Sequence, residues 1–178
     1  MTHGVTFEAW VPFPLQQVFL FFANTQNLPR IMPPAISARI DEMKLVAPIA
    51  APEPIETRRL AGVGSVIVTS FHIMPPLPFR ASWIARITEF DWNDHFVDVQ
   101  EKGPFRRFRH RRELAAEARG GVNGTMVRDR IVYEIGVGIL GEVAQRVFIR
   151  RAIGRTFHHR QSVLARWLGE GASTDTSL

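Results

Sequence analysis

The sequence predicts an α+β fold, with a curved antiparallel sheet of seven strands wrapped around a long C-terminal helix and two short helices after the first strand. Three observations predict it. The chain opens with apolar residues at every second position, β-branched and aromatic runs follow between short Gly, Pro and Asn turns, and residues 140–168 contain no proline. A curved sheet has to cover its apolar concave face, and only the long helix is large enough to do so.

The first strand is expected over residues 5–11, where apolar and polar side chains alternate. Pro14 can open a helix, because the first helical turn needs no amide donor there. A second short helix is expected around residues 25–32, before the prolines that begin at Pro33. The first helix carries apolar residues at helical spacing on one face, namely Leu15, Val18, Phe19 and Phe22.

The middle of the chain is expected to form consecutive antiparallel hairpins. Six further strands are predicted at residues 35–43, 65–73, 79–90, 95–102, 106–114 and 125–135. The Pro- and Ala-rich segment 46–62 is expected to be an irregular connection or a lengthened edge excursion. With 178 residues, the chain is expected to form a single domain over residues 1–170, followed by a frayed tail at 171–178.

Composition narrows the function classes. The chain has no cysteine, which excludes disulfides, thiolate nucleophiles and cysteine-based metal sites. It has no glycine-rich phosphate loop, no G-x-S-x-G elbow and no H-E-x-x-H motif, so neither a cofactor nor a metal is expected. No stretch reaches the roughly 20 apolar residues of a membrane span. No secretory signal is recognised, and we expect a cytoplasmic protein.

Five arginines and one histidine are packed into residues 106–112, within "QEKGPFRRFRHRREL". This run is either a strip that grips nucleic acid or a strand with one solvated face. If Leu114 pairs with Val127 in a hairpin, alternation separates the two faces of the strands. The inward face then carries Phe108, His110, Arg112 and Leu114 beside Val127, Asp129, Ile131 and Tyr133, while the remaining arginines face water.

Acidic residues one strand away favour the solvated face. The preceding hairpin is expected to pair Asp98 with Arg109 and Glu101 with Arg106, although a bulge at Gly103-Pro104 would move Asp98 to the other face. A nucleic-acid surface works better with few interleaved acids and with exposed aromatic rings. We therefore expect no nucleic-acid partner.

The order of elements resembles the helix-grip fold of the START-like, or SRPBCC, superfamily of polyketide cyclase/dehydrase and lipid-transport proteins. The resemblance is nearest to the bacterial ligand-binding branch of that superfamily, and it covers nearly the whole chain. It lies in "PFPLQQVFLFFANTQNLPRIMPP", "ARITEFDWNDHFVDVQEKGPFRRFRHRREL", "GTMVRDRIVYEIGVG" and "RVFIRRAIGRTFHHRQSVLARWL". Arg112 stands where that branch usually has a second histidine, and Gly136 stands where it commonly has proline.

The resemblance implies a cavity between the sheet and the C-terminal helix that binds a hydrophobic or amphipathic small molecule, such as a lipid or a polyketide. The apolar wall is expected to come from Phe108, Trp83, Val127, Ile131, Phe157 and Leu164, and the polar orientation from His110, Arg112, Asp129 and Tyr133. The repeated tetrapeptide "IMPP", at Ile31 and again at Ile73, is expected to line the mouth of the cavity.

Each polar candidate has two interpretations. His110 is either a general acid or base or a hydrogen-bonded structural histidine. Arg112 and Asp129 either fix an anionic or carbonyl group of a ligand or form a structural ion pair. Tyr133 either donates to a ligand or completes the same network.

Two rival functions follow from these residues. The first is a cyclase- or dehydratase-type enzyme that uses His110 and Asp129 in the same cavity, and fold alone does not choose between binding and catalysis. The second is a basic interaction module for an acidic partner or a membrane surface, carried by the helix residues Arg146, Arg150, Arg155 and Arg166.

Overall fold

The computed structural model describes residues 2–72, 79–135 and 149–174, and its described strands form one seven-stranded antiparallel sheet. The strand order is β1-β7-β6-β5-β4-β3-β2, so the first strand of the chain pairs with the last. This confirms the predicted fold class. The bounds are β1 Thr2–Val11, β2 Arg39–Lys44, β3 Val66–His72, β4 Arg80–Asp91, β5 His95–Lys102, β6 Arg107–Arg119 and β7 Val122–Glu134.

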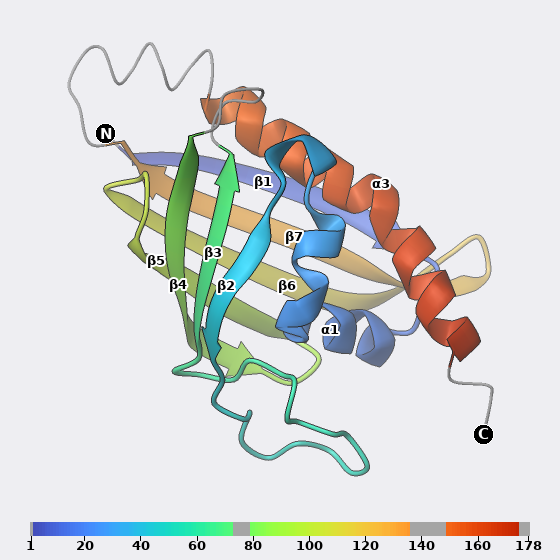
Figure 1. Cartoon of the computed structure of the whole chain (residues 1–178). Helices are drawn as coiled ribbons and strands as arrows, with labels where there is room; N and C mark the ends of the chain where they lie inside the picture. The colour runs from blue at the N-terminus through green and yellow to red at the C-terminus, as the bar shows by residue number, and fades with distance from the viewer. Residues whose placement is uncertain (1, 73–78, 136–148, 175–178) are drawn as a thin grey trace.

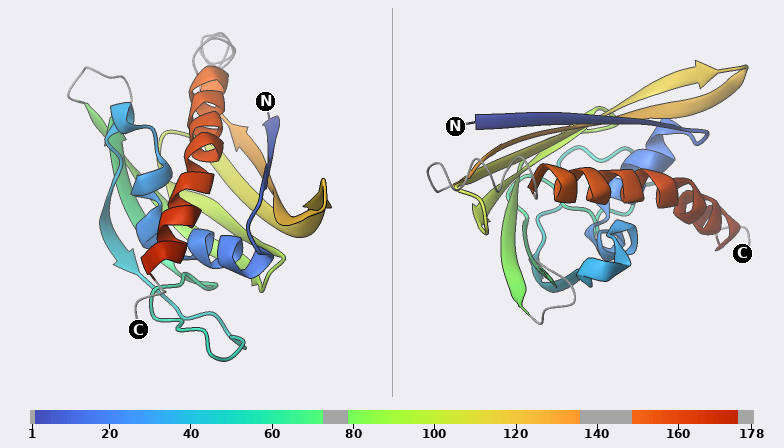
Figure 2. Two further views of the ribbon diagram at one scale, coloured as in Figure 1. Left: turned by 90° about the vertical axis from the view of Figure 1, so that its right-hand side faces the viewer. Right: turned by 90° about the horizontal axis from the view of Figure 1, so that it is seen from above.

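The long helix α3, Arg150–Thr174, lies along the concave face of the sheet (Figure 1). Figure 2 shows the sheet curling around this helix when the molecule is seen from above. The Phe157 ring of α3 stacks on the Phe7 ring of β1 with centroids 4.9 Å apart. The expected helix start at Leu140 lies outside the described residues, and the helix continues past Leu168 into the stretch where a frayed tail is expected.

The helix α1, Leu15–Ala23, buries the predicted face, with Val18 and Phe19 fully enclosed. The second short helix expected at residues 25–32 is present as two one-turn 3-10 helices, η1 Thr25–Asn27 and η2 Pro29–Ile31, rather than as one α-helix. A third, η3 Pro34–Ile36, follows. Prolines lack the amide donors that a continuous α-helix requires.

The strand β2 begins at Arg39, not at residue 35 as predicted. Ser37, which follows η3, has a left-handed backbone with φ 45°, and the chain turns there before it can extend. The connection over residues 46–62 has neither helix nor strand, as the Pro- and Ala-rich sequence predicts.

The predicted register of β6 and β7 is confirmed: Leu114 lies opposite Val127, and Arg112 lies opposite Asp129. The predicted register of β5 and β6 is wrong by one residue. Asp98 lies opposite His110 and not opposite Arg109. A slip of one residue moves a side chain to the other face, so Asp98 points inward.

A side-chain contact in the turn accounts for the shifted register. Gln100 Nε2 donates to the carbonyl of Phe105 at 2.7 Å, and the amide of Phe105 donates to Gln100 Oε1 at 3.3 Å. The side-chain amide of Gln100 thus makes hydrogen bonds that a backbone pair would otherwise make. The connection between β5 and β6 is one residue longer than in the predicted register. A Cβ atom at Gly103 would lie 2.5 Å from Gln100 Oε1, so the turn accommodates only glycine at that position without movement.

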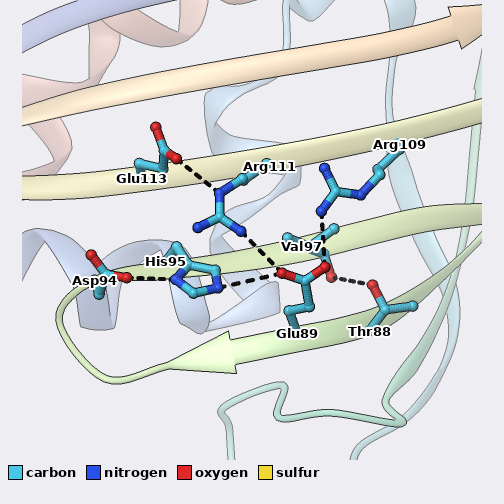
Figure 3. A network of polar contacts seen from close by, with 8 residues as sticks. All are labelled: Thr88, Glu89, Asp94, His95, Val97, Arg109, Arg111 and Glu113. Carbon is cyan, nitrogen blue, oxygen red and sulfur yellow. Dashed lines mark hydrogen bonds and ion pairs between the residues drawn. The ribbon is translucent and has the colours of Figure 1, made fainter.

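The outer face of β6 carries the arginine run in a network of ion pairs (Figure 3). Arg109 and Arg111 both pair with Glu89 of β4, at 2.8 and 3.0 Å, and Arg111 also pairs with Glu113 at 2.8 Å. The hydrogen bond from Arg109 lowers the pKa of Glu89. The outer face of the arginine run is therefore neutralised by acidic side chains, as predicted. The acidic partners differ from the predicted ones. Glu101 pairs with Arg86 rather than with Arg106.

Of the three apolar clusters among the described residues, the smallest holds Ala61, Ile67 and Ile87, and the two larger ones lie against α3. The first of these two joins α1, the sheet and the second half of α3. Its buried members include Val18, Phe19, Leu114, Val127, Leu164 and Leu168. The second lies under the first half of α3, with Ile131, Tyr133 and Phe157 buried and Phe105 and Phe108 packed against them. Among the described helices, none is both long and apolar enough to cross a bilayer.

Candidate functional site

A group of charged side chains lies on the inner face of the sheet, along the strand that connects the two apolar clusters. Alternation along β6 places Phe108, His110, Arg112 and Leu114 on this face in order, so the charges lie between apolar residues. His110 is 6% exposed, and Arg112 and Asp129 are each 4% exposed. Burying charges at such positions is costly unless they are paired.

Asp129 of β7 is the acceptor at the centre of the group. Its Oδ1 atom accepts from Arg112 Nε at 2.7 Å and from His110 Nε2 at 2.8 Å. Burial alone would raise the pKa of the Asp129 carboxyl, but Arg112 and the hydrogen bond from His110 outweigh it and hold that pKa well below its ordinary value. Asp129 is therefore a carboxylate at neutral pH.

His110 is held between two carboxylates. Its Nδ1 atom lies 3.0 Å from Asp98 Oδ1, and its Nε2 atom lies 2.8 Å from Asp129 Oδ1. An ionised carboxylate only accepts hydrogen bonds, so two carboxylate contacts favour the cationic ring, in which both nitrogens donate. Burial lowers the pKa of His110, but Asp98 and Asp129 raise it more, and the net shift is upward.

This arrangement predicts a pH dependence of folding stability. Because the folded-state pKa of His110 is raised, its contribution is fully present below the unfolded value of about 6.5 and is lost as the pH rises through the folded-state pKa. We expect the free energy of unfolding to fall as the pH rises above about 6.5, and His110→Asn to remove most of that fall. Urea unfolding at a series of pH values measures both, with the exposed His158→Gln as the control. An equal slope in parent and His110→Asn would contradict it.

Arg112 and Arg160 reach the same region from opposite sides. The Arg112 guanidinium lies over the ring of Phe22, 3.7 Å from its centroid, and Arg160 of α3 lies over the ring of Phe157 at 4.7 Å. Arg160 Nη2 donates to the sulfur of Met32 at 3.0 Å. Burial, and next the charge of Arg112, lower the pKa of Arg160 to about 10, so Arg160 remains charged at neutral pH.

Two guanidinium nitrogens in this region have no hydrogen-bond partner among the described residues. They are Arg112 Nη2 and Arg160 Nε, and both atoms are buried. Such donors are rare in folded proteins, because a buried N–H without an acceptor costs free energy. Both side chains come from elements that face each other across the interior, β6 and α3.

An aromatic group lies beside the charges. The Trp83 ring of β4 meets the Phe108 ring edge-on at 4.6 Å and the Phe105 ring at 5.7 Å. The Tyr133 ring lies 5.4 Å from Phe105. Trp83 and Phe108 remain partly exposed although they lie on the inner face, and Phe105, in the connection between β5 and β6, is partly exposed as well.

The predicted site residues are thus distributed over both clusters. Phe108, Ile131, Tyr133 and Phe157 belong to the second cluster, which Trp83 adjoins through its ring contacts. Val127 and Leu164 lie in the first cluster, in the packed core beside α1. The structure therefore brings His110, Arg112 and Asp129 together, while Tyr133 lies with the aromatic rings.

Two residues of the charged group are missed by sequence reasoning. Asp98 is missed because the register of the β5–β6 turn is set by a side-chain contact that strand alternation does not show. Arg160 carries a signal that is visible in the sequence, since it lies three residues after Phe157 and four before Leu164. Residues at this spacing share one face of a helix.

Only the first of the two "IMPP" copies predicted to line a cavity mouth lies among the described residues. Ile31 is buried, and Met32 accepts the hydrogen bond from Arg160, which places the first "IMPP" copy beside the charged group. The second copy, from Ile73 to Pro76, lies outside the described residues. Its place at a cavity mouth stays a prediction.

One cluster among the described residues has the donor types of a cation site. Asp91, Asp94 and His95, at the β4–β5 turn, have ligand atoms within 4.8 Å of one another. Both aspartates are exposed, and the His95 ring pairs with Asp94 at 2.6 Å and with Glu89 at 3.5 Å. Both ring nitrogens of His95 therefore already have carboxylate partners, on the outer surface and away from the charged group.

The comparisons with known proteins give likeness in structure alone. No family model matches the chain, and no curated protein matches it by sequence. A START-superfamily protein from Mycobacterium smegmatis has a TM-score of 0.65 at 13% identity, covering 94% of this chain and 98% of that one. The protein TTHA0849 from Thermus thermophilus has a TM-score of 0.63 at 14% identity, with 95% and 99% covered.

An enzyme is also among the similar structures. A point mutant of norcoclaurine synthase from Thalictrum, in complex with a transition-state analogue, has a TM-score of 0.59 at 11% identity, covering 93% of this chain and 96% of that one. At these identities the likeness shows a shared fold over nearly the whole chain.

Proposed function

From the helix-grip fold of START-superfamily proteins, which this chain has, we propose that it binds an amphipathic small molecule between the sheet and α3. One observation carries the proposal. Partly exposed aromatic rings on the inner face of the sheet lie in the same interior as two buried, unpaired guanidinium donors, one from β6 and one from α3. Small-molecule sites typically combine an apolar lining with a few fixed polar groups.

The aromatic residues supply the apolar part of this argument. In a closed core, inward rings such as Trp83 and Phe108 would be fully covered by their neighbours. Here they touch each other edge-on yet remain partly exposed. A bound apolar group would remove that remaining ring surface from water, which is favourable at roughly 25 cal/mol per Å².

The comparisons support this proposal at the level of the fold. The norcoclaurine synthase structure holds a transition-state analogue, so this fold accommodates a small molecule in at least one protein of similar structure. Fold does not choose between binding and catalysis, and the choice has to come from the residues.

The state of His110 favours binding over acid–base catalysis. Both of its nitrogens are engaged by carboxylates, and a cationic ring with two committed donors cannot take up a proton from a substrate. The enzyme alternative therefore needs Asp98 or Asp129 to move away first. The third function, a basic interaction module, keeps the exposed Arg150, Arg155 and Arg166 as candidates, while Arg146 lies outside the described residues.

A neutral fluorescent probe tests the proposal. We expect Nile red to bind the folded protein saturably, and Trp83→Ala to weaken that binding by roughly 10- to 100-fold, because the loss of a ring contact of this size costs roughly 1.5–3 kcal/mol. Val132→Ala, exposed on the outer face of β7, is the control. Trp83→Leu replaces Trp83→Ala if the latter does not fold.

Two outcomes would count against binding in this region. One is the absence of saturable Nile red binding to the parent protein. The other is equal Nile red affinity in Trp83→Ala, Val132→Ala and the parent. Native mass spectrometry of freshly purified protein adds an independent check, since a co-purified amphipathic molecule is expected to leave the folded protein on activation.

A further inference from the structure

The charged group has more positive than negative charge. Arg112, Arg160 and the His110 cation face the carboxylates of Asp98 and Asp129, which leaves one positive charge in excess. Asp129 Oδ1 is already shared by Arg112 and His110. Within the part of the chain that the structure describes, no ion pair joins Arg160 to a carboxylate.

Arg160 lies in an unfavourable position for a structural residue. Its guanidinium lies over the ring of Phe157. Among the described residues, its Nη2 atom donates to the weak acceptor sulfur of Met32, and its buried Nε atom has no acceptor. It also shares this region with the like charge of Arg112. A methionine would make the same apolar contacts without these costs.

Arg112 presents a second donor to the same region. Its Nε atom is committed to Asp129, whereas its Nη2 atom is buried and unpaired, in a side chain that is almost wholly enclosed. The two unpaired donors come from opposite sides of the interior, one from the sheet and one from α3. An acceptor that reached both would satisfy them and cancel the excess charge at once.

We propose that the ligand is an amphipathic carboxylic acid whose carboxylate is bound jointly by Arg112 and Arg160. This rests on the proposed function, and it adds the chemical class of the ligand. A carboxylate has two oxygens for two donors and supplies the missing negative charge, and guanidinium groups bind carboxylates with strong charge-assisted hydrogen bonds. A neutral carbonyl or hydroxyl would satisfy a donor but would leave the excess charge.

Matched acid and alcohol probes test the ligand class. The probes are decanoic acid with 1-decanol, and 2-naphthoic acid with 2-naphthalenemethanol, so that neither tail decides the result. Isothermal titration near neutral pH keeps both acids ionised, because carboxyl groups have pKa values near about 4. In each pair we expect the acid to bind the parent protein about tenfold more tightly than the alcohol, or better.

Arg160→Met is the decisive variant, because it removes the charge and the donors but keeps the apolar contacts. We expect it to weaken binding of each acid by about tenfold and to leave binding of each alcohol unchanged. Its melting temperature is expected to equal or exceed that of the parent. Arg155→Met, exposed on the same helix, is the control and is expected to leave all four affinities unchanged. Arg160→Gln serves as a second variant if Arg160→Met does not fold.

The outcomes separate this inference from the proposed function. If Nile red and the alcohols bind but the acids have no advantage, or if Arg160→Met leaves the acid affinities unchanged, the carboxylate inference is wrong and the binding site stands. If Arg155→Met weakens acid binding as much as Arg160→Met, general surface charge is responsible and the inference is again wrong. If no probe binds, Nile red included, the proposed function itself fails.

Discussion

Replacing either Arg112 or Asp129 with alanine is expected to lower the free energy of unfolding by about 3–5 kcal/mol, because each change takes an ion-pair partner away from a buried charge. Both side chains are buried, and Arg112 Nε lies 2.7 Å from Asp129 Oδ1. Asp129→Ala is expected to be the more severe change. It takes the acceptor from both Arg112 and His110, whereas Arg112→Ala leaves Asp129 with His110 and removes a like charge from Arg160.

The double variant Arg112→Met/Asp129→Leu separates the pair from its environment. Replacing both charges by apolar residues of similar size is expected to recover much of the stability that Asp129→Ala loses. Urea unfolding measures each variant, and Arg107→Ala is the matched control on the same strand. The Arg107 side chain is 78% exposed and 3.9 Å from Glu134, so its loss is expected to cost less than about 1 kcal/mol. Single variants that unfold like the parent would show that the buried pair contributes nothing.

Phe157→Ala is expected to destabilise the fold by about 3–5 kcal/mol, the range for removing a buried aromatic side chain. The Phe157 ring is buried, stacks on Phe7 of β1 and contacts His110 at 5.5 Å between centroids. The change leaves a cavity beneath α3 and removes the ring over which Arg160 lies. It therefore tests whether α3 is held to the sheet by this contact.

The control for this experiment lies on the same helix. Arg155 is exposed, and Arg155→Ala is expected to change the free energy of unfolding by less than about 0.5 kcal/mol. Hydrogen exchange of α3 amides locates the effect, since loosening of the helix raises exchange there before it reaches the central strands. A Phe157→Ala protein with parental stability would mean that α3 is anchored elsewhere, through Leu164 and Leu168.

Much of the fold could be predicted because its signals are local. Alternation identifies the strands, proline and glycine mark their ends, and the apolar face of residues 15–22 identifies the first helix. The 3-10 turns at residues 25–36 could not be predicted as such, because a short helix and a series of turns share the same composition there. The strand β2 begins later than predicted because Pro34 and Ser37 fix the backbone before it.

The charged group on the inner face could be predicted only in part from the local sequence. The pairing of Arg112 with Asp129 follows from the short turn between β6 and β7, which leaves one register that keeps Leu114 and Val127 together. The turn between β5 and β6 offers two registers, and the side chain of Gln100 selects the one that turns Asp98 inward. That choice makes His110 a cation held between two carboxylates.

The sequence alone was enough to predict a series of antiparallel strands, the inward face of β6 and β7, and a long helix to cover them. The pairing of β1 with β7, and the charges that meet on the inner face, depend on how the elements pack. Asp98 joins the charged group because a side-chain contact in the β5–β6 turn sets the register. Arg160 joins it because α3 packs with its Phe157 face toward the sheet. Periodicity along the chain shows which side chains share a face, whereas the meeting of charges from separate elements depends on how those elements pack in space.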